Sequence, residues 1–192
     1  MLFRSADAFD EKGDYDRAIE DLTRAIAVHP EDGAPYRDRA IVYRHQRDYE
    51  HALADCDKDV ELNPQEADSY VARGSVLRWG HEYDRAMADC NRALSLDPKS
   101  NAAYYGRGRI FYDQDDYDHA ISDFTAAIEQ DPKDEAAYNA RGKAWFKKGE
   151  HDKAWADVDA CRATGGVPDL TLVEELCAVT GRSESGPGAS TL

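Results

Sequence analysis

Four prolines spaced 34 residues apart constrain the fold of this chain more than any other feature of its sequence. They are Pro30, Pro64, Pro98 and Pro132, and each closes a similar segment, such as "GDYDRAIEDLTRAIAVHP" (13–30) or "DDYDHAISDFTAAIEQDP" (115–132). A fifth copy, "GEHDKAWADVDACRATGG", begins at Gly149 and lacks the proline. A sequence that repeats at one fixed period folds as an array of similar units.

Each repeat is expected to contain two helices. A tyrosine and a small residue recur four positions apart, and Tyr36, Ala40 and Tyr43 have the i, i+4, i+7 spacing of one helix face. The second helix is predicted to open after an acidic residue, which suits the positive end of a helix, and to stop at the proline. These acidic residues are Asp16, Glu50, Asp84, Asp118 and Asp152.

This order of residues resembles the tetratricopeptide repeat: an aromatic residue, a small one, a second large one, then alanine, a larger apolar group and proline. The second copy supplies Tyr36, Ala40, Tyr43, Ala52, Cys56 and Pro64, and the fourth supplies Tyr104, Gly108, Phe111, Ala120, Phe124 and Pro132. The resemblance covers residues 1–166 as five repeats, of which the first is truncated at its start. It implies an all-α, right-handed superhelix (a solenoid) that binds other proteins.

Both ends of the chain depart from the repeat. The first helix would start with Met1 already inside a turn, with Leu2, Ala6 and Phe9 as its apolar stripe and no capping residue before it. The segment 167–181 follows a break in phase at Gly165, Gly166 and Pro168. Its apolar stripe of Leu172, Val173, Leu176 and Val179, with Thr171 and Glu174 at capping-box spacing, predicts a capping helix over 172–180. Residues 182–192 are expected to be disordered.

Arginine and aspartate follow the period in two further columns. Arginine precedes the small residue, and aspartate holds a fixed position in the second helices, so each arginine should meet an aspartate of its own or the preceding repeat. The spacing does not choose between these two registers. We interpret the columns as a structural ladder of ion pairs between helices and leave the arginines out of the ligand site. The members are Arg39, Arg73, Arg107 and Arg141, with Asp21, Asp55, Asp89, Asp123 and Asp157.

A second stripe on the first helices lies on the face that tetratricopeptide superhelices usually turn toward their concave groove. It contains five cations and three aromatic residues in a chain of formal net charge −15. Such side chains would hold an extended, acidic or carboxylate-bearing peptide, although they could also be solvated cations that neutralise an acidic protein. The predicted groove consists of Arg37, Ile41, Arg44, Val71, Ser75, Arg78, Tyr105, Arg109, Tyr112, Asn139, Lys143 and Phe146. Trp79 is a further candidate anchor at its edge.

Some members of the family are co-chaperones that grip a C-terminal carboxylate with lysine, asparagine and arginine side chains. At those positions this chain has Arg37, Ile41, Ser75, Tyr105 and Arg109. Only the two arginines keep the needed chemistry, and the two amides that orient the carboxylate are missing. This departure disfavours co-chaperone-like binding and leaves an acidic side-chain ligand open.

The overall charge and the absence of targeting segments narrow the partners. A net charge of −15 and a pI near 4.7 repel a phosphate backbone, so nucleic acid is not an expected partner. No apolar stretch reaches the roughly 20 residues of a membrane-spanning helix, and no secretory signal opens the sequence. We therefore expect a cytoplasmic protein that does not bind membranes, unless a missing amino-terminal segment carried a signal.

No catalytic residue, metal site or cofactor is predicted, so we do not expect an enzyme. Cys56, Cys90, Cys161 and Cys177 lack C-x-x-C spacing, which favours free thiols in a reducing compartment. Neither these cysteines nor His51 and His119 show the positioned nucleophile and base of a catalytic pair. The acidic run "DQDDYD" (113–118) lacks the glycine and the distant glutamate of a calcium-binding loop.

Self-assembly is the alternative to peptide binding. An uncapped first helix could continue a longer solenoid, of which this chain is a fragment, or could pair with a second copy of the chain. A homodimer formed through residues 1–12 would make the protein structural rather than a peptide receptor.

Overall fold

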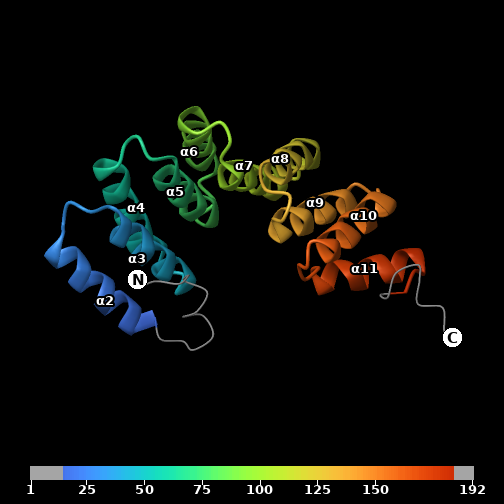
Figure 1. Cartoon of the computed structure of the whole chain (residues 1–192), viewed down its shortest axis with the longest axis horizontal. Helices are drawn as coiled ribbons and strands as arrows, with labels where there is room; N and C mark the ends of the chain where they lie inside the picture. Colours follow the sequence, from blue (N-terminus) through green and yellow to red (C-terminus); the bar gives the residue numbers. More distant parts are fainter. Residues whose placement is uncertain (1–14, 184–192) are drawn as a thin grey trace. The chain divides into compact units, whose positions relative to one another are not determined.

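The structure is a computed structural model that describes residues 15–183, and over this range it consists of helices and short connections (Figure 1). The predicted all-α fold is confirmed. The proposed helix around Leu2, Ala6 and Phe9, the homodimer contact built on it and most of the proposed tail lie outside the described residues. The chain divides into two compact units, Met1–Pro98 and Lys99–Leu192, and each is described by itself.

The described part of the first unit contains two complete helix pairs and one preceding helix. The helices are α2 (Tyr15–Val28), α3 (Ala34–His45), α4 (Tyr49–Leu62), α5 (Ala67–Trp79) and α6 (Tyr83–Leu96). In each pair the first helix packs on the second, α3 on α4 and α5 on α6, while α2 packs on α3 and α4 packs on α5. Helices that follow one another in the sequence are thus in contact throughout the described part of this unit.

The second unit repeats this arrangement and adds one helix. Its helices are α7 (Asn101–Asp113), α8 (Tyr117–Gln130), α9 (Glu135–Lys147), α10 (His151–Ala163) and α11 (Leu170–Thr180). The last helix buries Leu172, Val173 and Leu176 against Ala154, Trp155 and Val158 of α10. Val179, which the apolar pattern placed in this stripe, is 58% exposed. The next residue, Thr180, still accepts a hydrogen bond from Trp155 of α10 at 3.1 Å, so Val179 lies on the side of α11 that faces away from α10.

The second helices begin two residues earlier than predicted. Their first described residues are Tyr49, Tyr83, Tyr117 and His151, so the acidic residues named above lie inside the first turn. The caps are the residues just before the helices: Asp48 accepts a hydrogen bond from the amide of His51, and Asp116 accepts one from that of His119. These bonds, and those from the two imidazoles, lower the pKa of both carboxyls.

The start of α11 also corrects the sequence analysis. Asp169, not Thr171, is the capping residue, and its carboxylate accepts a hydrogen bond from the amide of Leu172 at 3.0 Å. Thr171 lies inside the helix, which begins at Leu170. The capping box was therefore wrong.

The turn inside each helix pair reverses direction at the same position of the repeat. Arg47, His81 and Asp115 have positive φ angles of 62°, 61° and 61°, and Gly149, at the same position of the next repeat, has 78°. Residues other than glycine rarely adopt this left-handed conformation. The same backbone geometry therefore closes each described pair, whichever residue the sequence supplies.

The small residue and its partner are matched in size in two of the helix pairs. Phe124 is fully buried on α8, and a Cβ atom added to Gly108 of α7 would lie 2.7 Å from its ring. In the first unit the position of Phe124 is held by Cys90, and a Cβ atom on Gly74 would lie 3.4 Å from its sulfur. Phe124 therefore requires glycine opposite it, whereas Cys90 leaves room for alanine.

This size match predicts opposite effects for the same substitution. Gly108→Ala should lower the free energy of unfolding by about 1–3 kcal/mol because it overpacks the core against Phe124. Gly74→Ala, the matched control, should be neutral or raise it by up to about 1 kcal/mol because alanine favours the helix. Urea denaturation followed by circular dichroism measures both, and equal destabilisation by the two variants would contradict the size match.

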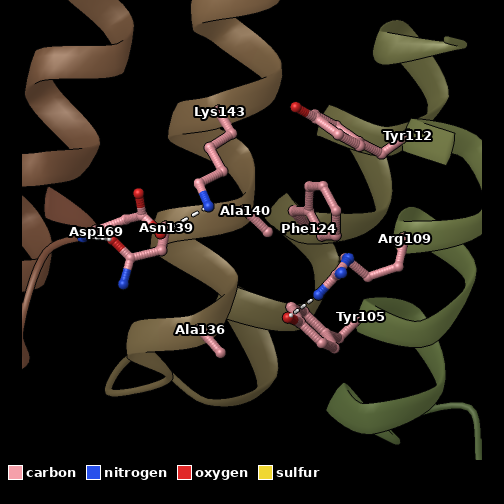
Figure 2. Close-up of a pocket in the computed structure, with 9 residues that line it drawn as sticks. All are labelled: Tyr105, Arg109, Tyr112, Phe124, Ala136, Asn139, Ala140, Lys143 and Asp169. Carbon is pink, nitrogen blue, oxygen red and sulfur yellow. Dashed lines mark hydrogen bonds and ion pairs between the residues drawn. The ribbon is translucent and has the colours of Figure 1, made fainter. Parts of the chain in front are cut away.

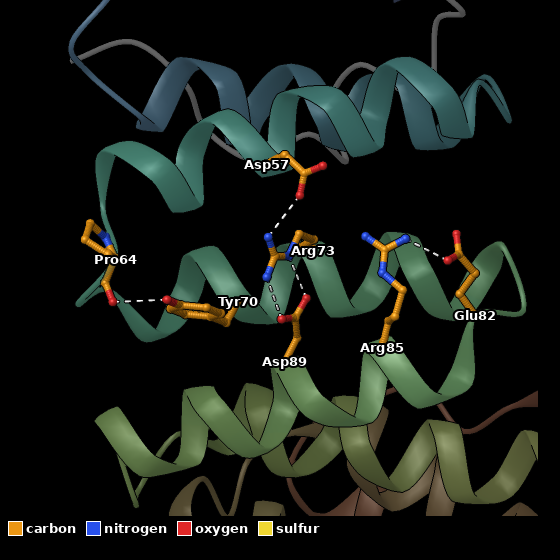
Figure 3. Close-up of polar contacts among 7 residues, drawn as sticks. All are labelled: Asp57, Pro64, Tyr70, Arg73, Glu82, Arg85 and Asp89. Carbon is orange, nitrogen blue, oxygen red and sulfur yellow. Dashed lines mark hydrogen bonds and ion pairs between the residues drawn. The ribbon is translucent and has the colours of Figure 1, made fainter.

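The ladder of ion pairs uses the aspartate of the same repeat. Arg73 of α5 donates to both carboxylate oxygens of Asp89 on α6, at 2.7 and 2.8 Å, and its third nitrogen reaches Asp57 of α4 at 2.9 Å (Figure 3). In place of this third contact with an aspartate, Arg39 donates to Thr23 and Arg141 donates to Thr125, each on the preceding second helix. The pairs are Arg39–Asp55, Arg73–Asp89, Arg107–Asp123 and Arg141–Asp157.

Candidate functional site

Ten of the twelve residues of the predicted groove line two pockets, one in each unit. The first-unit pocket contains Arg37, Ile41, Arg44, Val71 and Ser75, and the second-unit pocket contains Tyr105, Arg109, Tyr112, Asn139 and Lys143. Residues at the same position of the repeat thus meet between successive first helices, α3 with α5 and α7 with α9.

Arg78 and Phe146 line neither of these pockets. Arg78 is only 8% exposed and its guanidinium lies 4.8 Å from the ring centre of its neighbour Trp79. Phe146 packs against the core cluster of α10 and α11 and beside the ring of His151. Trp79 is 44% exposed and lines a separate hollow with Arg44.

The pocket of the first unit has a volume of about 320 Å³, and the charges of its cations are partly satisfied within the protein. Arg37 reaches the fully buried carboxylate of Asp59 at 3.5 Å, and Arg44 donates to Ser75 at 3.3 Å. Asp68 also lines this pocket and adds a negative charge. An acidic ligand would therefore compete with groups that are already in place.

The pocket of the second unit is larger, about 390 Å³, and is lined by aromatic side chains. Figure 2 shows Tyr105 and Arg109 on α7 facing Asn139 and Lys143 on α9, with Phe124 between the two helices. Burial raises the pKa of the Tyr112 hydroxyl even though the Arg109 charge opposes this shift. The tyrosine is neutral at physiological pH, so the pocket combines aromatic walls with two cations.

Arg109 is held in the second-unit pocket by a tyrosine and not by an acid. Its Nη1 donates to the hydroxyl oxygen of Tyr105 at 2.8 Å, and the guanidinium lies 5.7 Å from the centre of the same ring. Over residues 15–183 no carboxylate pairs with Arg109. The side chain is positioned by a neutral partner, and its charge is available to a ligand.

Lys143 is paired with a residue that sequence reasoning did not place at the site. Its Nζ lies 2.6 Å from the carboxylate of Asp169 (Figure 2). Burial would raise the pKa of Asp169, but hydrogen bonds from Lys143 and from the amides of Leu172 and Thr171 outweigh burial and lower it. Asp169 follows the break in the repeat, so no periodic column could have assigned it to this pocket.

Three of the four cysteines are buried. Cys56, Cys90 and Cys161 are at most 1% exposed, and burial, followed by nearby aspartates, raises the pKa of Cys56 to about 12. A thiol with this pKa is protonated and unreactive at neutral pH. His51 and His119 are exposed, and their rings stack on Tyr43 and Phe111.

Two further findings concern metal binding and membrane spanning. Within residues 15–183 no group of three or more histidine, cysteine, aspartate or glutamate side chains is placed to hold a metal ion. None of the helices in the same range is long and apolar enough to cross a bilayer.

The chain matches the model of the tetratricopeptide repeat family at residues 9–76 and 80–143, together more than half of its length. No curated protein sequence matches it. The helical arrangement is similar to solved structures of low sequence identity, and these likenesses concern the fold alone.

Three of these structures illustrate the similarity. PilW, a type IV pilus biogenesis factor, is 17% identical with a TM-score of 0.79, over 93% of this chain and 84% of its own. TTC0263, a protein of Thermus thermophilus, is 17% identical with a TM-score of 0.77, over 91% and 95%. YrrB, described as having an unusual peptide-binding site, is 21% identical with a TM-score of 0.59, over 92% and 89%.

Proposed function

Because this chain belongs to the tetratricopeptide repeat family, whose fold generally serves as a non-catalytic scaffold for protein–protein interaction, we propose that its second-unit pocket binds an extended acidic segment of a partner protein. The carboxylate of the partner pairs with Arg109, and its neighbouring apolar groups pack on Tyr105 and Tyr112. No bond is made or broken. Shape and charge complementarity produce the affinity and the specificity.

The available charge of Arg109 is the observation that carries the proposal. A protein of net charge −15 has ample carboxylates for pairing with surface cations, and most of its described arginines have such partners. Arg109 instead lies in a pocket with a neutral tyrosine as its hydrogen-bond partner. Hydrogen bonds between an arginine and a carboxylate are shorter and stronger than neutral ones, and aromatic walls reduce the screening by water.

The first-unit pocket is less suited to an acidic ligand. The carboxylate of Asp59 already lies 3.5 Å from the guanidinium of Arg37. An acidic ligand that pairs with Arg37 therefore gains less binding free energy than one that pairs with Arg109. Val71 and Ile41 provide apolar contacts instead. The first-unit pocket is therefore suited to apolar groups of a ligand more than to its carboxylates.

Arg109→Glu tests this function directly. A charge-assisted hydrogen bond contributes about 1.5–3 kcal/mol, so reversal of the charge should weaken binding of acidic peptides about tenfold or more. The measurement is fluorescence anisotropy with a library of unstructured peptides and their counterparts in which glutamine and asparagine replace glutamate and aspartate. Binding to the intact protein should favour the acidic set and decrease as salt is raised.

Arg85→Glu is the matched control for the change in net charge. Arg85 is exposed on α6, pairs with Glu82 at 2.7 Å and lines neither of the two pockets. This variant should bind the acidic peptides as the intact protein does. Equal weakening by the two variants, or binding that is the same at low and high ionic strength, would contradict the proposal.

A further inference from the structure

The row of side chains on α9 already holds a segment of the chain itself. Val167, Pro168 and Asp169 are the last three residues of the connection between α10 and α11. This segment contacts Glu135, Asn139 and Lys143. The three side chains on α9 are spaced by four residues, so they lie in one row along the helix. Two of them, Asn139 and Lys143, also line the second-unit pocket.

Asn139 contacts the backbone of this segment with both ends of its amide. Its Nδ2 donates to the carbonyl oxygen of Val167 at 3.0 Å, and its Oδ1 accepts from the amide of Asp169 at 2.8 Å. These two backbone groups flank one residue, and they face the same side when that residue is extended. The residue between them is Pro168, which lies outside any helix or turn and whose ring fixes φ near −65°.

The remaining contacts define what the row recognises. Glu135 accepts a hydrogen bond from the amide of Val167 at 3.0 Å, and the side chain of Val167 is 70% exposed. The row on α9 therefore recognises the first position through hydrogen bonds to its backbone and not through its side chain. Only the third position is read through its side chain, by the pairing of Lys143 with the carboxylate of Asp169 at 2.6 Å.

We infer that Glu135, Asn139 and Lys143 form a site for an extended segment with a carboxylate at its third position, and that residues 167–169 are its internal ligand. An acidic segment of a partner competes with Asp169 for Lys143. This inference rests on the proposed function, because Arg109 is the anchor that stays open while the internal ligand is bound. The internal ligand lowers the affinity for acidic segments and restricts the site to partners that can displace it.

Asp169→Asn separates the charge of the internal ligand from its structural role. Asparagine caps a helix as well as aspartate does, so α11 should keep its position while Lys143 loses its partner. The probe is a labelled, acetylated and amidated peptide with the sequence of residues 165–171, "GGVPDLT", and the control peptide has asparagine in place of aspartate. The variant should bind the acidic probe about threefold more tightly than the intact protein, as expected for loss of a partly exposed ion pair.

Two further measurements identify the residue and the segment that respond. The double variant Asp169→Asn, Lys143→Met should lose the threefold gain, and the neutral peptide should not distinguish the variants. Hydrogen exchange at the amides of Val167 and Asp169 should accelerate when the intact protein is saturated with the acidic probe, because displacement breaks their bonds to Glu135 and Asn139.

The outcomes distinguish this inference from the proposed function. If the intact protein and Asp169→Asn bind the acidic probe equally, or if exchange at residues 167 and 169 is unchanged on saturation, the internal ligand is refuted. The effect of Arg109→Glu on the peptide library still tests the proposed function in that case. If no acidic peptide binds any of these proteins, both the inference and the function are refuted.

Discussion

Phe124→Ala is expected to lower the free energy of unfolding by about 3–5 kcal/mol, the range for truncating a buried phenylalanine. Phe124 is fully buried between α7, α8 and α9 and packs with Ala120, Ile121, Ala140 and Ala144. The partner that faces its ring is Gly108, which has no side chain to fill the cavity. Urea denaturation followed by circular dichroism measures the loss.

Cys90→Ala is the control at the same position of the repeat. Cys90 is 1% exposed, and loss of one buried sulfur should cost about 1 kcal/mol, comparable to a buried methylene group. If the two substitutions lowered stability equally, the core of the second unit would not depend on Phe124 as its packing indicates.

Asp157→Ala is expected to lower the free energy of unfolding by about 3 kcal/mol, because it leaves a partly buried arginine without its carboxylate. The side chains of Arg141 and Asp157 are 19% and 5% exposed, and the other partner of Arg141 is the neutral hydroxyl of Thr125. Burial raises the pKa of Asp157, against the opposing effect of Arg141. The same denaturation experiment measures this variant.

Asp89→Ala tests whether the missing charge is the cause. Its partner Arg73 keeps a second carboxylate, Asp57, at 2.9 Å, so its loss should be about half that of Asp157→Ala or less. A loss for Asp89→Ala that equals or exceeds the loss for Asp157→Ala would show that packing, and not charge compensation, determines the cost.

The repeat period was sufficient to predict the helix pairs and much of the core. Each core position occurs in several copies, so the alanine column at Ala52 and Ala86 could be recognised without any structure, and both residues are fully buried. The register of the ion pairs could not be predicted, because each arginine lies between two second helices. In the structure Arg73 contacts both of them, which explains why neither choice was excluded by spacing.

The parts that were wrong or missed lie where the period does not apply. Asp169 follows the phase break, so nothing in the repeat associates it with Lys143, although the distance between them is 2.6 Å. The starts of the second helices were displaced because the tyrosine or histidine before each acidic residue is itself helical. Arg78 has the periodicity of a groove residue, but its stacking on Trp79 depends on one local neighbour that the other repeats lack.

The arginine ladder has a consequence for how this protein unfolds. Arg73 connects α4 to α6, and Arg141 connects α8 to α10, so each arginine depends on helices from two successive repeats. If one helix pair detached, a charged group or a hydroxyl in the neighbouring pair would lose its hydrogen-bond partner. Opening of adjacent pairs is thereby coupled within each unit, and fraying at one helix should spread through the unit instead of stopping at a repeat boundary.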